Sequence, residues 1–184
     1  RRVGRAIGAG LEGRKGLYTV VLRSTSLPGT TEQVLAPAVR EAAGSTGADV
    51  AFAMNPEFMR EGSSLEDFWH PPFVVVGSDD PRAARVVTSL YARLEAPLVT
   101  TSIATAELVK YASNAFHGLK VCFANEMGDL CDALGTDALE VMRIFAMDRT
   151  RHISAAYLRP GFAFGGSCLP KDFRALLWDA RDHT

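Results

Sequence analysis

Short apolar runs rich in β-branched residues alternate with helical patterns over the first hundred residues. The apolar runs are mostly continuous, as is typical of parallel strands that are buried on both faces. They predict strands at about 17–23, 49–54, 73–77 and 98–100, with helices between them at about 31–43 and 81–94. Pro37 lies inside the first helical pattern, where it removes an amide donor. This alternation predicts an α/β fold built on a partial, Rossmann-like parallel sheet.

From Ser102 onward the pattern is helical only. Apolar residues recur at helical spacing from Ile103 to Leu134, with Ser102 as a cap and Gly135 as a stop. A helix of about 32 residues is roughly 48 Å long, so we expect it to link two units or to pack against a second copy of itself. Further helices are predicted at about 137–147 and 169–181. The predicted domains are therefore a sheet domain at 1–101 and an all-helical domain at 102–184.

The composition is that of an ordinary globular protein, with 184 residues, 47% apolar residues and a net charge of −1. This charge gives no basic field for binding nucleic acid or an anionic membrane, and no apolar run reaches the roughly 18 residues of a membrane helix. The three cysteines lack the spacing of a disulfide framework or a metal site. We therefore expect free thiols, no metal, and a cytoplasmic location without export.

Residues 8–13, Gly-Ala-Gly-Leu-Glu-Gly, satisfy the GxGxxG pattern of dinucleotide-binding proteins. The pattern binds a pyrophosphate when its glycines follow a strand and open a helix. Here a helical pattern precedes the glycines and the predicted strand 17–23 follows them. We therefore interpret this segment as a helix-to-strand connection, and we expect a genuine phosphate loop to lie upstream of Arg1.

Cys168 is the strongest candidate for a chemical role. Two glycines and a serine precede it and a predicted helix follows it, so the backbone amides of the first turn stabilise its thiolate. Gly165 leaves room for a substrate to approach the sulfur. Asp172 lies one helical turn further on the same face, and Lys171 supplies a cation nearby.

Polar residues at three other places extend this candidate site. Lys110 and Asn114 are one turn apart on the long helix, where together they could hold an oxyanion. Ser24-Thr25 and the segment 55–61 follow the carboxyl ends of two predicted strands, where open α/β sheets bind ligands. If the segment 55–61 is helical, Glu57 and Glu61 share a face, and paired carboxylates suit proton transfer.

At these residues the sequence resembles the UDP-glucose/GDP-mannose dehydrogenase family, whose members oxidise the C6 alcohol of a sugar nucleotide to a carboxylate with two NAD+. The matching stretches are RST with PGT at 23–30, NPEFMREG at 55–62, ELVKYASNAFHGLKVCFANE at 107–126 and GFAFGGSCLPKD at 161–172. They follow the family's order over nearly the whole chain, and the last is highly specific.

The resemblance implies a covalent mechanism. Cys168 would be the nucleophile that forms a thiohemiacetal with the C6 aldehyde, and a second oxidation would give a thioester that water hydrolyses. The other implied catalytic residues stabilise the oxyanion, position water or act as the base in hydrolysis, and they are Lys110, Asn114, Asp172, Thr25 and Glu57.

The resemblance also implies binding roles and an assembly. Glu61, Lys171 and Ser24 would contact NAD, while the sugar nucleotide would contact Phe58, Met59, Gly165 and, from the neighbouring subunit, Arg159. The long helix at 103–134 would form the core of a homodimer. The family's first βαβ unit and its last domain have no counterpart in the chain, so we expect little dehydrogenase activity from it alone.

Three alternatives remain open. The residues of the motifs favour GDP-mannose as substrate, whereas UDP-glucose or a related UDP-sugar is the second choice. The chain as it stands could instead serve mainly as a dimerisation module through the helix 103–134. A thiol acyl-transferase or protease would need a histidine that activates Cys168, and none is placed for this by sequence.

Overall fold

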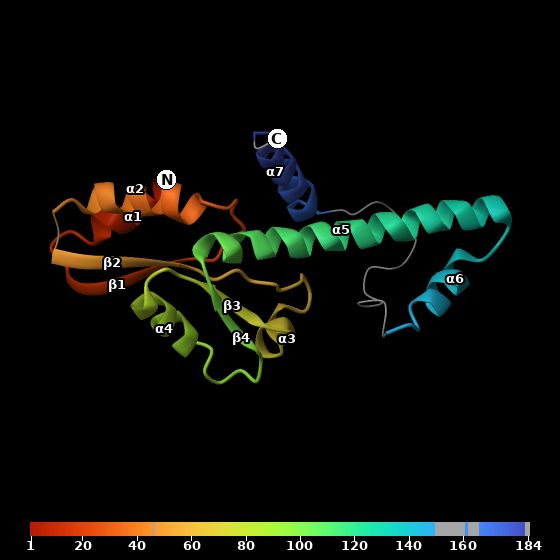
Figure 1. Ribbon diagram of the computed structural model, residues 1–184, viewed down its shortest axis with the longest axis horizontal. Helices are drawn as coiled ribbons and strands as arrows, with labels where there is room; N and C mark the ends of the chain where they lie inside the picture. The colour runs from red at the N-terminus through yellow and green to blue at the C-terminus, as the bar shows by residue number, and fades with distance from the viewer. Residues whose placement is uncertain (46, 150–160, 162–165, 183–184) are drawn as a thin grey trace. The chain divides into compact units, whose positions relative to one another are not determined.

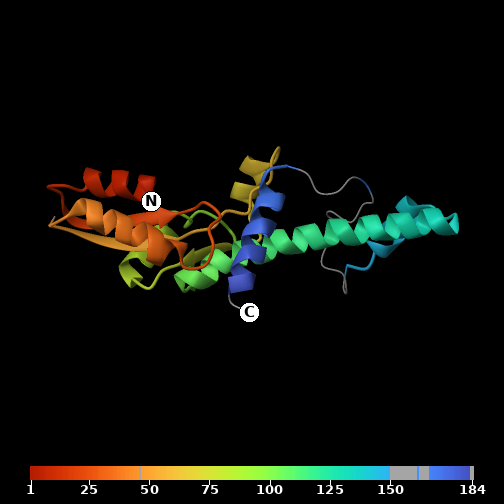
Figure 2. The same ribbon diagram turned by 90° about the horizontal axis from the view of Figure 1, so that it is seen from above.

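The computed structural model describes residues 1–45, 47–149, 161 and 166–182. These residues form two compact units, Arg1–Lys110 and Tyr111–Thr184, and the division falls inside one long helix. Figures 1 and 2 show that this helix, α5 (Ile103–Leu134), is uninterrupted. Each unit is described by itself below.

The first unit is built on a four-stranded sheet of β1 (Lys15–Leu22), β2 (Gly47–Met54), β3 (Val74–Gly77) and β4 (Leu98–Thr101). The strands lie side by side in chain order. β1 is parallel to β2, with Leu22 opposite Met54, and β3 is parallel to β4, with Val74 opposite Leu98. The predicted α/β fold and its four strands are confirmed.

The sheet is mixed, however, and not wholly parallel as predicted. β2 and β3 are antiparallel neighbours that meet at Met54 and Gly77. Parallel neighbours need a crossover segment that returns the chain to the same end of the sheet, which α2 (Ala36–Ala43) and α4 (Pro81–Ser89) supply for the two parallel pairs. Between β2 and β3 the structure has only the six-residue helix α3 (Ser64–Trp69), which the sequence pattern did not predict.

Both faces of the sheet are covered, which explains the continuous apolar runs. Figure 1 shows α1 (Arg2–Gly10) and α2 on one face and α4 on the other. Side chains of β2 alternate between the two apolar clusters: Phe52 and Met54 pack with α2 and the start of α5, and Ala53 packs with α4. Each face therefore has its own apolar cluster, and the buried residues 51–54 of β2 and 74–76 of β3 are all apolar.

The predicted helix at 31–43 forms in two parts. Residues Thr30–Leu35 make a π-helical segment, η1, and α2 continues from Ala36. Pro37 then lies at the beginning of α2, where a missing amide donor is tolerated. The helix predicted at 81–94 ends earlier, at Ser89.

The first glycine of the GxGxxG segment, Gly8, serves packing between helices. α1 precedes β1, so the order is helix then strand, and our interpretation of this segment as a connection is confirmed. A Cβ atom at Gly8 would lie 2.3 Å from the carbonyl oxygen of Val39 and 2.8 Å from Cβ of Ala42. Glycine at this position therefore lets α1 approach α2 closely, as Figure 2 also shows.

The second unit consists of helices: the rest of α5, then α6 (Ala138–Phe145) and α7 (Cys168–Asp182). Asp137 caps α6 by accepting a hydrogen bond from the amide of Leu139 at 2.8 Å. Gly135 ends α5 with φ of 67°, a left-handed conformation that favours glycine. Ala124 and Met142 are buried together between α5 and α6.

Among the described residues, no helix combines the length and the apolar character that a membrane span requires.

Candidate active site

The two parallel strands β1 and β2 end side by side and bring two predicted segments to the same edge of the sheet. The amide of Asn55, directly after β2, donates to the carbonyl of Leu22 at the end of β1, at 2.9 Å. Ser24 and Thr25 follow Leu22, and the segment 55–61 follows Met54. Their polar groups therefore lie where open α/β sheets bind ligands.

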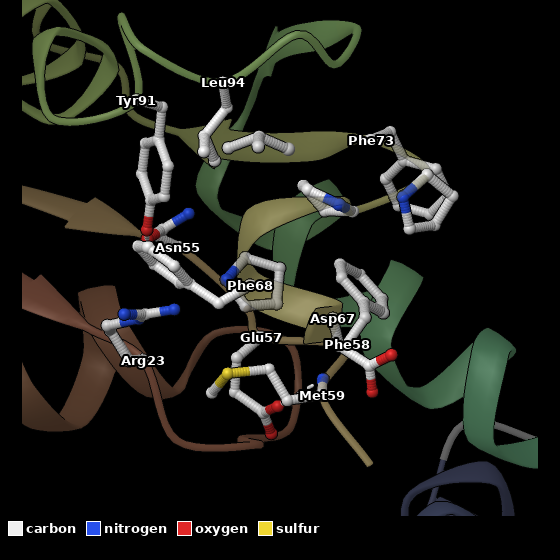
Figure 3. Close-up of a pocket in the computed structure, with 14 residues that line it drawn as sticks. Arg23, Asn55, Glu57, Phe58, Met59, Asp67, Phe68, Phe73, Tyr91 and Leu94 are labelled. Atoms are coloured by element: carbon white, nitrogen blue, oxygen red, sulfur yellow. Dashed lines mark hydrogen bonds between the residues drawn. The ribbon is translucent and has the colours of Figure 1, made fainter. Parts of the chain in front are cut away.

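Asn55 fixes the beginning of the second segment. Its side chain is buried, donates to the carbonyl of Val75 at 2.8 Å, and accepts a hydrogen bond from the hydroxyl of Tyr91 (Figure 3). Residues 55–60 form no helix, so the helical alternative for Glu57 and Glu61 is wrong. Since Asn55 already ties this segment to β3 and to the turn after α4, an extended path is the one that keeps a buried amide satisfied.

Glu57 pairs with Lys110 and not with Glu61. Nζ of Lys110 lies 3.3 Å from Oε1 of Glu57 and 5.3 Å from the ring centre of Phe58. Lys110 is 7% exposed, and a buried ammonium needs such an anionic partner. The other carboxylate oxygen of Glu57 accepts the amide of Met59 at 2.8 Å. The structure thus brings together the base and the cation that the resemblance implies.

A small apolar pocket lies beside Glu57 (Figure 3). Phe58 and Met59 line it, and the rings of Phe58 and Phe73 meet edge to face at 5.0 Å. Asp67 also lines the pocket and is held by a two-pronged ion pair with Arg60, whose hydrogen bonds keep the pKa of Asp67 well below its ordinary value. The ring of Phe58 thus has the ammonium of Lys110 near it and the ring of Phe73 packed against it.

The second unit holds Cys168, Lys171, Asn114 and Asp172. Cys168 is the first residue of α7 and is exposed. Asp172, one turn further, is 3% exposed, and its Oδ2 accepts a hydrogen bond from Nδ2 of Asn114 at 2.6 Å. Its Oδ1 lies 3.3 Å from Nζ of Lys171 and accepts no hydrogen bond within the described part of the chain. The structure thus joins Asn114 and Asp172, which are far apart in the sequence.

A glycine allows α7 to pack closely against α5. A Cβ atom at Gly118 would lie 2.2 Å from Cζ of Phe173, so the ring occupies the space of the missing side chain. Gly118 is one turn beyond Asn114 on α5, and Phe173 adjoins Asp172 on α7. Two consecutive contacts, one polar and one apolar, therefore fix α7 and with it the position of Cys168.

Arg159 and Gly165 lie outside the described residues. Sequence reasoning also missed two residues of the first unit, Tyr91 and Glu107. Glu107 is fully buried and binds the backbone of residues 29–31. A carboxylate three residues before Lys110 in an apolar helix was the signal that could have revealed it.

Comparison with known proteins shows the family of the chain. Residues 1–95 match the NAD binding domain of the UDP-glucose/GDP-mannose dehydrogenase family, and residues 104–184 match its central domain. The chain belongs to this family. The resemblance stated from the motifs is thereby confirmed. The expectation of NAD as cofactor is confirmed as well, because residues 1–95 match the NAD binding domain.

Individual members of the UDP-glucose/GDP-mannose dehydrogenase family are similar along the whole chain. GDP-mannose 6-dehydrogenase of Azotobacter vinelandii is 46% identical over 95% of the chain, which spans 42% of that protein. The structure of a UDP-glucose dehydrogenase from Pyrobaculum islandicum matches 98% of the chain with 43% identity and a TM-score of 0.92, and 41% of that protein is covered. A GDP-mannose dehydrogenase from Pseudomonas aeruginosa matches 98% with 41% identity and a TM-score of 0.79, and 42% of it is covered. The chain thus spans about two fifths of the length of its relatives.

Proposed function

We propose that the chain supplies the thiol chemistry and part of the cofactor site of an NAD-dependent sugar-nucleotide 6-dehydrogenase. The observation that carries the proposal is the pair of Asn114 and Asp172, joined at 2.6 Å beside the helix that begins with an exposed Cys168. Asp172 lies one turn beyond Cys168 on α7, so this pair ties two polar side chains from distant parts of the sequence to the helix that begins with the thiol.

The reaction would use Cys168 as a covalent carrier. Its thiolate attacks the carbon of the C6 aldehyde, a C–S bond forms, and the carbonyl oxygen becomes the hydroxyl of a thiohemiacetal. Oxidation of this adduct gives a thioester, and water then attacks its carbonyl carbon. The C–S bond breaks, the carboxylate is released and the thiol is restored.

The remaining catalytic residues would act on the oxyanion and on water. Lys110 and Asn114 stabilise the negative oxygen, Thr25 and Asp172 orient the water, and Glu57 accepts its proton. The contact with Asn114 favours this role of Asp172, since it fixes the carboxylate by one oxygen and leaves the other without a hydrogen bond among the described residues. The pairing of Glu57 with Lys110 favours the role of Glu57, because it fixes this carboxylate beside the ammonium that is proposed to hold the oxyanion.

The residues at the sheet edge fit part of an NAD site. Ser24 is exposed and Thr25 half-buried after β1, while Glu61 is exposed after β2, so hydroxyl and carboxylate groups are available for ribose hydroxyls and the nicotinamide amide. Lys171, with an exposed side chain, is proposed as a contact of the cofactor phosphates. When bound, NAD+ accepts a hydride in each of the two oxidations. We also propose a domain division at 1–101 and 102–184. The proposed contacts of the sugar nucleotide are Phe58, Met59, Gly165 and, from a neighbouring subunit, Arg159.

Two substrates have support. GDP-mannose, which would give GDP-mannuronate, is favoured by the motif wording and by the 46% identity to a GDP-mannose 6-dehydrogenase. UDP-glucose is the second candidate, because a UDP-glucose dehydrogenase has the TM-score of 0.92.

The test uses a polypeptide that carries this chain together with the remaining parts of the family architecture. We expect two NADH per sugar nucleotide, measured by absorbance, with GDP-mannose preferred over UDP-glucose. Cys168→Ser should lower carboxylate formation by about 10³-fold or more, because the covalent carrier is lost. Cys122→Ser, which changes another exposed thiol, is the matched control and should keep its activity.

Undiminished turnover by Cys168→Ser would remove the covalent mechanism. The absence of NADH formation with every sugar nucleotide would remove the proposed function itself. The 184-residue chain alone should form little NADH, and substantial activity of that chain would show that it needs no further domain.

A further inference from the structure

Glu107 is a fully buried carboxylate to which the proposed mechanism assigns no role. Burying an ionised carboxylate is costly unless donors replace its water. Here three donors do so. Oε2 accepts the amide of Gly29 at 2.6 Å, while Oε1 accepts both the amide of Thr31 at 2.8 Å and its hydroxyl at 2.7 Å.

The segment that receives this carboxylate is shaped for it. Gly29 has φ of 88°, a left-handed conformation, and η1 begins directly after it. This conformation turns the amides of Gly29 and Thr31 toward the same point, and unpaired amides at the start of a helical segment favour an anion. A side chain at position 29 would also meet Gln33 at 3.0 Å. Glu107 therefore occupies a fitted site and does not merely fill space.

Glu107 connects two parts of the proposed active site. On one side it binds Gly29 and Thr31, at the end of the loop that joins β1 to η1 and contains Ser24 and Thr25. On the other it lies three residues before Lys110, so the two share one side of α5 within a single turn. Lys110 in turn pairs with Glu57 at 3.3 Å. A shift of this turn would move the ammonium away from the carboxylate.

We propose that Glu107 is a positioning residue, which anchors the first turns of α5 to the loop 24–31 and thereby holds Lys110 against Glu57. The proposal rests on the proposed function for the meaning of that pair, but its geometry is testable without activity. Glu107 itself touches no reacting atom in this account.

The experiment measures how readily Lys110 is modified in the 184-residue chain. Reductive methylation with formaldehyde is followed by peptide mass spectrometry, with the exposed Lys15 as internal reference. In Glu107→Gln an NH2 group replaces one carboxylate oxygen and faces a backbone N–H of Gly29 or Thr31. One hydrogen bond is then replaced by a repulsion between two donors. We expect Lys110 to react about tenfold faster relative to Lys15, since the turn opens more often. Thr31→Val, which removes only the hydroxyl donor, should give a smaller increase of about threefold.

Val39→Ala is the matched control. Val39 is fully buried in the apolar cluster that also contains Ile103 and Ala106 of α5. Its truncation therefore destabilises this unit without removing a contact of Glu107. Lys110 should then react less than about twofold faster, because the local turn stays closed. If Glu107→Gln does not fold, as judged by circular dichroism, Thr31→Val decides the question. An unchanged Lys110 rate in the folded variants, or an equal rise in Val39→Ala, would overturn the proposal.

A second measurement separates this proposal from the proposed function. In the polypeptide with the full family architecture, Glu107→Gln should lower kcat by about 10- to 100-fold, as expected when a catalytic group is misplaced. A wild type without activity would contradict the proposed function and leave the result for Lys110 in force. An active wild type with an unchanged Lys110 rate would contradict the positioning role alone.

Discussion

At the scale of single residues, the buried ionisable side chains Lys110, Glu107 and Asp172 each have groups that replace at least part of their water. Lys110 has the carboxylate of Glu57 and the ring of Phe58, and Glu107 has three donors at 2.6–2.8 Å. Asp172 has a donor on one oxygen, and among the described residues its other oxygen pairs with an exposed lysine. The partly satisfied carboxylate is therefore the one with capacity left for a ligand.

The pair of Lys110 and Glu57 predicts a stability effect. Glu57→Gln leaves a buried ammonium without an anion, and we expect the free energy of unfolding to fall by about 1–2 kcal/mol, a value reduced because Glu57 is partly exposed. Urea unfolding of the chain measures it. Glu61→Gln is the same substitution at an exposed position four residues on and should change the free energy by less than about 0.5 kcal/mol. Equal effects of the two variants would show that the pair contributes nothing.

Asp80 predicts how stability depends on pH. Hydrogen bonds from Arg82 lower the pKa of Asp80 to about 2, below its ordinary value of 3.8. A depressed folded pKa gives stability that is present above pH 4 and is lost as the pH falls toward 2. Asp80→Asn retains a helix cap but not the charge, so its melting temperature should decline less steeply over this range in thermal scans. A parallel decline in both proteins would contradict the assignment.

At the scale of elements, the sequence predicted most strands and helices because apolar periodicity and caps are local signals. Ser102, Gly135 and Asp137 each mark a helix end, and the structure has those ends. The antiparallel pairing of β2 with β3 was not predictable, since one contact at Met54 and Gly77 depends on the path of the whole segment between them. The same holds for the site. Motifs identified Lys110, Asn114 and Asp172, but only the fold shows which partner each one has.

The packing of α1 on α2 predicts opposite effects at two glycines. Gly8→Ala places a Cβ atom against the backbone of α2 and should lower the free energy of unfolding by about 1–3 kcal/mol through overpacking. At Gly10, on the same helix, an added Cβ has nothing within 4 Å. Gly10→Ala should therefore be neutral or stabilising by up to about 1 kcal/mol. Chemical denaturation of both variants tests this, and a harmless Gly8→Ala would show that the helices can separate freely.

At the scale of the whole molecule, apolar side chains remain exposed along α5. Leu119 is 62% exposed and Leu134 is 68% exposed, and Phe116, Phe123 and Leu130 are exposed as well. Large exposed apolar side chains gathered on one helix are typical of an interface. This agrees with the expectation that the helix 103–134 packs against a second copy, and it leaves the dimerisation module as an alternative role for the isolated chain.

Sedimentation of the purified chain tests this expectation. We expect a dimer at micromolar concentration, and the double variant Leu119→Glu with Leu134→Glu should be monomeric, because two buried charges oppose association. Leu90→Glu changes a similarly exposed leucine directly after α4 and should leave the dimer intact. A monomeric wild-type chain, or dissociation by Leu90→Glu, would contradict an interface on α5.

The contact between Gly118 and Phe173 has a consequence for evolution within the family. Because the ring fills the gap above the glycine, any larger residue at position 118 obliges either the ring or α7 as a whole to move. The orientation of Cys168, the proposed nucleophile, is then adjustable from a neighbouring helix, without alteration of the residues proposed to contact the sugar nucleotide. Reactivity and substrate choice can thus diverge through independent substitutions.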